Sequence, residues 1–494
     1  MQASDAITLN TNANGQSPPL SCCASWLCAL CLTRMTLMTH PIPASIFRAY
    51  DIRGIYNETL TDAWAYEIGR AIGSEVQAQG QTAIAIGRDG RLSGPALLQA
   101  LSEGVQSTGC AVVNVGLVPT PVLYFATHHI EGLNSGVMLT GSHNPGNYNG
   151  FKIVIDGVTL SGERIQALHR RIVDQRFAEG QGEYREQDVL VDYQAAFLSA
   201  HSLARPMKVV VDCGNGITGL QAPQVLEALG CEVVPLFTDV DGTFPNHHPD
   251  PGDLNNLQDL IASVKAEKAD LGLAFDGDGD RVGVVTPAGE VVYPDILLMA
   301  LAEDMVSRHP GAKVIFDVKC TGSLFDVIRD AGGEPEMWQT GHSLIKARMK
   351  ETGALLAGEM SGHIFFAEDW YGFDDALVAA ARILGIISRT EGGAEALFGR
   401  YPVLCTTPEI NINVTDENKF RIVEYLQTNA EFGEGERRVI DGIRMDYADG
   451  WGLCRASNTS PKLVLRFEAD NDEALGRIRD LFEVNVSKAM AAVG

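Results

Sequence analysis

The segment Thr140-Gly141-Ser142-His143-Asn144-Pro145 is the one around which the chain is best interpreted. It follows a short apolar run, residues 136–139, which is typical of a strand that ends at a loop. Glycine at position 141 lets the backbone approach a ligand closely, and proline at 145 ends regular strand pairing. The sequence therefore places the Ser142 hydroxyl at the rim of a sheet, with the ammonium of Lys152 returning toward the same loop. A polar surface turn is the alternative for this segment taken alone.

A second segment, Asp276-Gly277-Asp278-Gly279-Asp280-Arg281, carries three carboxylates at alternate positions. Like charges this close repel one another unless a cation lies among them. An EF-hand loop has Gly at its sixth position and Glu at its twelfth, where this chain has Arg281 and Pro287, which argues against calcium. Three carboxylates in an open site suit Mg²⁺, and the apolar run at residues 271–275 predicts a buried strand that delivers them. A solvated acidic turn is the alternative here.

Together these two segments resemble the active-site serine loop and the metal-binding loop of the α-D-phosphohexomutases. Residues 46–56, read as a strand followed by a turn over Tyr50 to Gly54, resemble the opening signature of that family. Two later segments resemble its sugar-binding and phosphate-binding loops, namely Gly358-Glu359-Met360-Ser361-Gly362-His363 and Arg455-Ala456-Ser457-Asn458-Thr459-Ser460-Pro461. The resemblance runs from about residue 41 to the C-terminus, and the last two loops look like the bacterial phosphomannomutase/phosphoglucomutase branch.

The resemblance implies an isomerase that interconverts α-D-hexose 1-phosphates and hexose 6-phosphates, with mannose, glucose or both as the sugar. Ser142 would carry a phosphoryl group, and hexose 1,6-bisphosphate would serve as intermediate and activator. Mg²⁺ would be held by Asp276, Asp278, Asp280 and the phosphorylated Ser142. The products would feed nucleotide-sugar and polysaccharide synthesis.

The positions that match the family's motifs fall into two functional groups. The expected catalytic residues surround the transferred phosphoryl group or move protons at the attacking sugar hydroxyl: Ser142, His143, Lys152, Arg53, Arg281 and His363. The expected substrate-binding residues hold sugar hydroxyls or the phosphate that is not reacting: Tyr50, Lys319, His342, Glu359, Ser361, Arg455, Ser457, Asn458 and Thr459. The sequence does not assign which group is the acid and which is the base. Residues 369–375 follow the sugar-binding loop and are expected to pack beside it.

Strands that end in a loop recur along the chain, at residues 83–88, 208–212 and 313–317. Each is followed by a helical stretch and another strand, which predicts three related α/β domains with mixed sheets around a central cleft, and then a C-terminal α+β domain. Residues 1–40 are expected to form a disordered, dispensable extension. The expected domains are residues 41–187 with the phosphoserine loop, 188–290 with the metal loop, 291–402 with the sugar-binding loop and 403–494 with the phosphate-binding loop.

Acidic residues outnumber basic ones by 63 to 38 in this chain of 494 residues, so the net charge is −25. That charge argues against nucleic acid or an anionic membrane as a partner, and we expect a monomer that binds phosphorylated hexoses. Because those substrates are anions, the site must be locally positive, and the cations available are Arg53, Lys152, Arg281, Lys319, His342 and Arg455. Ten cysteines in a chain of this length do not indicate a disulfide scaffold, so a reducing cytoplasm is expected.

Two other enzyme classes fit parts of the sequence. Residues 214–219, Gly-Asn-Gly-Ile-Thr-Gly, follow a predicted strand, and Asp239 comes about twenty residues later, as in a nicotinamide-dependent oxidoreductase. That interpretation leaves the serine loop, the three acids and Lys319 unexplained. Ser142 could also be the nucleophile of a serine hydrolase, but the Gly-x-Ser-x-Gly elbow is absent around it.

Overall fold

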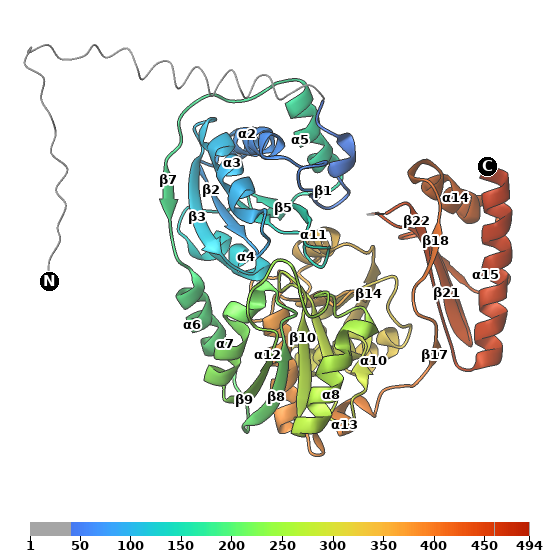
Figure 1. Ribbon diagram of the computed structural model, residues 1–494. Helices are drawn as coiled ribbons and strands as arrows, with labels where there is room; N and C mark the ends of the chain where they lie inside the picture. The colour runs from blue at the N-terminus through green and yellow to red at the C-terminus, as the bar shows by residue number, and fades with distance from the viewer. Residues whose placement is uncertain (1–40, 459, 494) are drawn as a thin grey trace, which may run out of the picture. The chain divides into compact units, whose positions relative to one another are not determined.

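The computed structural model describes residues 41–458 and 460–493 (Figure 1). The extension predicted at residues 1–40 and the predicted site residue Thr459 lie outside the described residues. Residues from Pro43 onward belong to a single unit of mutual contacts, and the fold below is that of this unit.

The first sheet is mixed and has the strand order β1-β5-β4-β2-β3-β7. Its centre is parallel, while β5 returns antiparallel between β4 and β1. The predicted strand before the Ser142 loop is confirmed as β4. The strands are β1 (Ile52–Ile55), β2 (Ala83–Arg88), β3 (Ala111–Leu117), β4 (Gly136–Leu139), β5 (Tyr148–Ile155), β6 (Val158–Thr159) and β7 (Tyr184–Glu186). The helices are α2 (Asp62–Ala78), α3 (Gly94–Gln106), α4 (Thr120–His129) and α5 (Glu163–Val173).

The second and third sheets repeat this plan of parallel strands followed by an antiparallel return. The second has the order β12-β11-β10-β8-β9 and the third β14-β13-β15-β16. Their strands are β8 (Met207–Asp212), β9 (Cys231–Leu236), β10 (Leu271–Phe275), β11 (Val282–Val285), β12 (Val291–Val292), β13 (Lys313–Asp317), β14 (Glu334–Trp338), β15 (Leu356–Gly358) and β16 (Ile364–Phe366). Their helices are α6 (Leu190–Ala200), α7 (Ala222–Leu229), α8 (Gln258–Glu267), α9 (Pro294–Arg308), α10 (Leu324–Asp330), α11 (His342–Thr352), α12 (Ala376–Arg389) and α13 (Gly393–Phe398).

The fourth sheet is antiparallel throughout. It consists of β17 (Cys405–Thr406), β18 (Ile410–Asn413), β19 (Glu436–Arg438), β20 (Ile443–Tyr447), β21 (Gly450–Ala456) and β22 (Lys462–Ala469), with α14 (Asp416–Asn429) and α15 (Asp472–Val493). Leu426 of α14 and Phe482 of α15 pack with Phe467 of β22 in its core. The prediction of three α/β domains with mixed sheets and a C-terminal α+β domain is confirmed.

Two local predictions are wrong. Tyr50 to Gly54 were expected to form a strand followed by a turn, but a bend at residues 49–51 precedes β1, so Arg53 lies within a strand. Arg455 was assigned to a turn, yet it lies in β21. In both cases a partner distant in sequence defines the strand, because β1 pairs with β5 and β21 pairs with β22.

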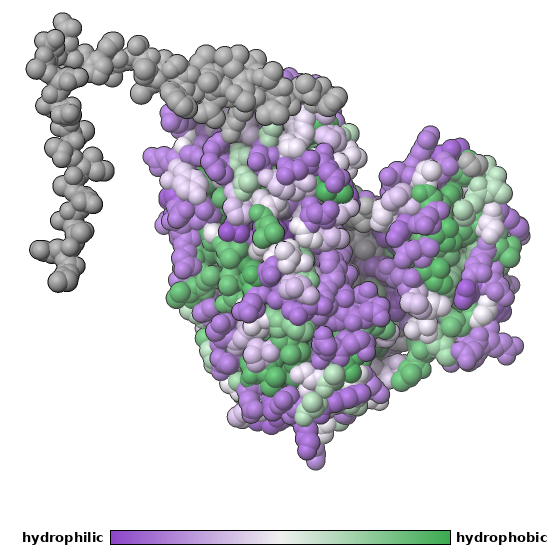
Figure 2. Space-filling model, viewed as in Figure 1, coloured by the Kyte–Doolittle hydropathy of each residue, from purple (hydrophilic) through white to green (hydrophobic). Residues whose placement is uncertain are grey.

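The face drawn in Figure 2 is mostly hydrophilic, with smaller hydrophobic patches between the polar areas. None of the described helices is both long and apolar enough to cross a membrane.

Helices α2 and α3 approach each other closely through glycines. A Cβ atom on Gly104 would lie 2.0 Å from the carbonyl oxygen of Tyr66, and one on Gly69 would lie 2.3 Å from that of Leu101. Real Cβ atoms do not come this close to backbone atoms, so any side chain at these positions forces the two helices apart.

We therefore expect Gly104→Ala to destabilise the protein by about 2 kcal/mol or more, because the added methyl group overpacks the contact between the helices. The midpoint of urea or thermal unfolding measures the effect. Gly476→Ala in α15 is the matched control, since a Cβ there meets no atom within 4 Å. That change should stabilise the protein by about 0.5 to 1 kcal/mol through helix propensity. Equal effects of the two changes would contradict close packing at Gly104.

Candidate active site

The Ser142 side chain lies in a strained, buried loop after β4. Its backbone has φ +51°, a conformation that non-glycine residues rarely adopt. The Ser142 hydroxyl donates to Asp276 Oδ2 at 3.1 Å and lies 3.2 Å from His143 Nδ1. Burial, and then the charges of Arg281 and Arg53, hold the pKa of His143 well below its usual value, so its ring is neutral.

A buried ion pair that the sequence analysis missed shapes this loop. Asp89 Oδ2 accepts hydrogen bonds from Arg91 Nε at 3.0 Å and from Thr140 Oγ1 at 2.8 Å. The Arg91 guanidinium donates to four backbone carbonyls of the loop, those of Ser142, Asn144, Pro145 and Tyr148. The available signal was Arg88-Asp89-Gly90-Arg91 at the end of β2, which pairs directly with β4.

The three acids follow β10 as predicted and are fully buried. Asp276, Asp278 and Asp280 each place a carboxylate oxygen within 4.8 Å of the others. Burial and then repulsion by its two neighbours raise the pKa of Asp276 well above its usual value. Oδ1 of Asp278 and Oδ1 of Asp280 are buried and have no hydrogen-bond partner among the described residues. An all-oxygen set with unpartnered oxygens fits a hard cation such as Mg²⁺.

Lys152 supplies positive charge to this acidic loop from β5. Its ammonium donates to Asp278 Oδ2 at 2.6 Å and to Asp280 Oδ2. Although burial acts to lower it, the carboxylates of Asp278 and Asp280 raise the pKa of Lys152 above its usual value. Lys152 therefore stays charged in the site.

His363 lies beside the same acids, and its surroundings define its tautomer. Arg281 Nε donates to His363 Nε2 at 3.0 Å. Because a guanidinium only donates, Nε2 carries the lone pair and Nδ1 carries the proton of the neutral ring. Nδ1 lies 3.1 Å from Asp374 Oδ2 and 3.6 Å from Asp280 Oδ1, although neither contact has the geometry of a hydrogen bond.

Asp374 belongs to residues 369–375, which were expected to pack beside the sugar-binding loop. That packing is confirmed, because Asp374 forms a β-bridge with Phe365 and the Asp375 amide donates to the carbonyl of Ile364. Lys346 Nζ donates to Asp374 Oδ1 at 2.9 Å, which holds the carboxylate in place. The sequence analysis missed Asp374 as a site residue, since nothing local links it to His363.

Four of the predicted sugar-binding and phosphate-binding residues lie around the start of α11, namely Tyr50, His342, Glu359 and Asn458. The Glu359 carboxylate accepts from the Gly341 amide at 2.5 Å, and the His342 ring stacks on that of His363 with centroids 5.6 Å apart. The Tyr50 hydroxyl donates to the Thr340 carbonyl at 2.7 Å and accepts from the Asn458 amide. Ser361 lies on the same loop as Glu359, and Ser457 Oγ lies 3.2 Å from Ser460 Oγ.

Five of the six groups expected to make the site positive are cations paired with a carboxylate: Arg53 with Asp51, Lys152 with Asp278, Arg281 with Asp276, Lys319 with Glu409 and Arg455 with Asp441. The expectation of a sixth cation at His342 is wrong, because burial and then the charge of Lys346 hold the pKa of His342 well below its usual value, and its neutral ring lies 3.8 Å from Asp374. Three of these carboxylates, Asp374, Glu409 and Asp441, were not foreseen from the sequence. The described part of the site thus offers paired cations to an anionic substrate.

The glycine turn at residues 214–219 lacks the geometry of a dinucleotide site. It leads into a short 3₁₀ helix, Ile217–Leu220, and α7 begins only at Ala222. The Ile217 amide donates to the carbonyl of Gly277 at 3.1 Å, and a Cβ on Gly216 would lie 3.0 Å from Gly277 Cα. The glycines therefore let this turn pack against the acidic loop.

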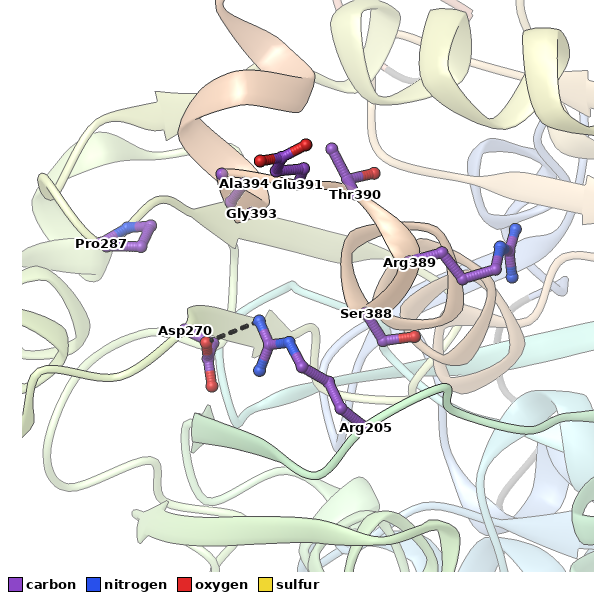
Figure 3. Close-up of a pocket in the computed structure, with 10 residues that line it drawn as sticks. Arg205, Asp270, Pro287, Ser388, Arg389, Thr390, Glu391, Gly393 and Ala394 are labelled. Atoms are coloured by element: carbon purple, nitrogen blue, oxygen red, sulfur yellow. Dashed lines mark hydrogen bonds and ion pairs between the residues drawn. The ribbon is translucent and has the colours of Figure 1, made fainter.

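A surface pocket of about 580 Å³ lies apart from these residues (Figure 3). Arg205 and Asp270 line it and are hydrogen-bonded to each other at 3.0 Å. Ser388 Oγ, also in its wall, accepts from the Ala204 amide. None of the predicted site residues lines this pocket, so it is not the candidate active site.

Four family models match consecutive parts of the chain. The phosphoglucomutase/phosphomannomutase alpha/beta/alpha domains I, II and III match residues 44–179, 190–289 and 293–403, and the C-terminal domain of the same family matches residues 409–483.

Relatives match over most of their length as well. A phosphomannomutase/phosphoglucomutase of Pseudomonas aeruginosa is 60% identical over 447 residues, which are 90% of this chain and 96% of the relative. A phosphoglucomutase of Neisseria meningitidis is 52% identical over 446 residues, again 90% and 96%. The crystal structure of a family protein from Burkholderia thailandensis superposes with a TM-score of 0.87 at 51% identity, covering 91% of this chain and 98% of its own. With all four domains matched in order, the chain belongs to the phosphoglucomutase/phosphomannomutase family.

Proposed function

We propose that this protein is a phosphohexomutase that interconverts glucose and mannose 1-phosphates with the corresponding 6-phosphates through a phosphorylated Ser142. The observation that carries the proposal is the contact between the Ser142 hydroxyl and Asp276, at the edge of a buried three-carboxylate cluster. Phosphoryl transfer depends on placing the group in line and neutralising its oxygens, and this cluster can hold the cation that does so. The names of the Pseudomonas and Neisseria relatives support both sugars.

The proposed cycle has two transfers through the same serine. In the first, the bond between phosphorus and Ser142 Oγ breaks, a bond to the 6-oxygen of the hexose 1-phosphate forms, and the hydroxyl proton leaves. The resulting hexose 1,6-bisphosphate turns around, the bond between phosphorus and its 1-oxygen breaks, and a bond to Ser142 Oγ forms. The Ser142 hydroxyl gives up its proton and the 1-oxygen takes one up, which releases the hexose 6-phosphate. Asp276, Asp278 and Asp280 would hold Mg²⁺, which when bound neutralises charge on the transferred group.

We assign the proton transfers to His363 and Lys152. The lone pair on His363 Nε2 makes it the base for the sugar hydroxyl once Arg281 turns its guanidinium to the phosphoryl oxygens. Lys152 is charged, so it stabilises the transferred group and returns a proton to Ser142 Oγ when the serine is the leaving group. Arg53 offers a second forked donor.

The phosphate that is not reacting needs one binding site for both orientations of the sugar. We propose Arg455, Ser457, Asn458 and Thr459 for that role, with Lys319, His342 and Tyr50 beside them. Glu359 and Ser361 would hold the 3- and 4-hydroxyls, which glucose and mannose present alike. An enzyme that binds only these hydroxyls does not distinguish the sugars at C2.

We further propose a cytoplasmic monomer. All six cysteines that the structure describes are unpaired, which supports a reducing compartment. The net charge of −25 supports small phosphorylated sugars over nucleic acid as partners.

Removing the Ser142 hydroxyl tests the cycle. Ser142→Ala should lower turnover of glucose 1-phosphate, assayed with glucose 1,6-bisphosphate and Mg²⁺, by about a thousandfold or more, because no phosphoenzyme forms. Intact-mass spectrometry should show one phosphoryl group on the wild type and none on the variant. Ser307→Ala, an exposed serine on α9, should behave like the wild type. Equal turnover by Ser142→Ala would falsify the phosphoserine cycle.

Metal removal tests the acidic loop. A chelator should abolish turnover, and Mg²⁺ should restore it and raise the thermal midpoint, since a ligand at a hundredfold its Kd stabilises by about 2.7 kcal/mol. Asp278→Asn should weaken both responses because it removes one ligand charge. Asp326→Asn, an exposed acid on α10, is the control. A midpoint that rises equally with Mg²⁺ in wild type and Asp278→Asn would place the ion elsewhere.

Replacing Asp374 tests the assignment of His363. Asp374→Asn should lower kcat by about tenfold to a hundredfold with little change in KM, because the amide cannot stabilise the protonated imidazole. The ring ¹⁵N shifts of His363 should also report loss of the Nδ1–H tautomer. Asp369→Asn, an exposed acid in the same segment, is the matched control and should leave kcat unchanged. An unaltered kcat in Asp374→Asn would rule out this role.

A further inference from the structure

The pair formed by Lys319 and Glu409 differs from the other ion pairs of the site. Lys319 follows β13, whereas Glu409 precedes β18 in the fourth sheet. The Lys319 ammonium donates to Glu409 Oε1 at 2.8 Å. The lysine side chain is 9% exposed and the glutamate side chain 40% exposed. One partner is therefore buried and the other lies partly in solvent.

The buried partner is fixed through its backbone. Arg444 Nη1 donates to the carbonyls of Val318 and Cys320 at 2.7 and 2.8 Å, and Arg466 Nη1 donates to that of Lys319 itself. Two guanidiniums thus hold three successive carbonyls of this loop. Both arginines lie over the ring of Trp451, which packs the contact further. The backbone from which the Lys319 side chain extends is consequently held in place.

The exposed partner, Glu409, can move away from Lys319 with little loss of folding free energy. Glu409 lies outside regular structure, between Pro408 and the first residue of β18, and its carboxylate already faces water in part. Partly exposed ion pairs contribute little stability, because water replaces most of the lost interaction. A buried lysine that lost its carboxylate without a replacement would be unfavourable, so a second anion has to take its place.

Asp441 provides the contrast on the neighbouring arginine. Its Oδ2 accepts from Arg455 Nε at 3.0 Å and from the Thr340 amide at 3.1 Å, and its side chain is 14% exposed. Because one of its oxygens accepts two hydrogen bonds and its side chain is little exposed, Asp441 is held in a fixed position. It orients the Arg455 guanidinium and is not displaced by a ligand.

We propose that Glu409 acts as an intramolecular substitute for substrate, occupying the Lys319 ammonium until the phosphate of a sugar phosphate displaces it. The inference rests on the proposed function, since it concerns the phosphate-binding side of the same site. A phosphate dianion carries more negative charge than the Glu409 carboxylate, so it interacts more strongly with the Lys319 ammonium and displaces Glu409. A monoanion carries the same charge as Glu409 and has no such advantage. Glu409 thereby raises KM and selects dianionic ligands.

Neutralising Glu409 tests the exchange. Glu409→Gln should lower the KM for glucose 1-phosphate by about fivefold with kcat nearly unchanged, because the ligand no longer competes with a carboxylate. Glu409→Asp keeps the charge and should stay near the wild-type KM. Asp441→Asn should move KM in the opposite direction, upward. Thermal midpoints of the three variants check that each one folds.

Direct binding separates this inference from the proposed function. Titration calorimetry with glucose 1-phosphate, on Ser142→Ala with and without Glu409→Gln, should give about fivefold tighter binding in the double variant. An unchanged or weaker affinity, or a raised KM in Glu409→Gln, overturns the inference while the mutase stands. A wild type that binds glucose 1-phosphate but never isomerises it overturns the proposed function, and the two dissociation constants still decide the role of Glu409.

Discussion

Three carboxylates buried within 4.8 Å of one another are the constraint on which the rest of the structure depends. Such a cluster is unstable alone, so positive charge and donors must come to it from elsewhere in the chain. The first domain supplies the Lys152 ammonium and the Thr120 hydroxyl, which both donate to the Asp278 carboxylate, while the Thr120 amide donates to the backbone carbonyl of Asp278. A Cβ on Gly277 would lie 2.5 Å from the Ser142 carbonyl, so only glycine lets the serine loop and the acidic loop meet.

The third domain completes the arrangement from the opposite side. His363 contributes a neutral ring whose two nitrogens differ in role, because Arg281 faces one and Asp374 the other. Asp374 is in turn fixed by Lys346, which lies over the Tyr124 ring of α4. The contacts of Ser142 with Asp276, of Arg281 with His363 and of Lys346 with Tyr124 each cross a domain boundary, so moving any one of these elements disturbs the others.

The contrast between what the sequence predicted and what it missed follows from the range of the interactions. Ser142 and the three acids were predicted because the residues that define each motif are adjacent in the sequence and follow a predicted strand. Arg91 and Glu409 were missed because each acts on a residue far away in sequence, Arg91 on carbonyls some fifty residues later. The predicted order of strand and turn around Arg53 was wrong for the same reason, because β1 forms by pairing with β5, which is distant in sequence. Asp374 was missed because no motif joins it to His363, although the two are close in sequence. Local patterns indicate which groups do chemistry, and only the fold indicates which groups hold them in place.

The many carboxylates of the chain affect how tightly it can bind phosphates. With every expected cation except the neutral His342 paired to a carboxylate, binding a phosphate at these positions is an exchange of one anion for another. The affinity is then a difference between two charge interactions and stays moderate even for a doubly charged ligand. The proposed cycle needs this property, because in it the bisphosphate has to stay bound through a half turn and the product has to leave afterwards. Unpaired cations in a buried site would bind both phosphates so tightly that release limited turnover.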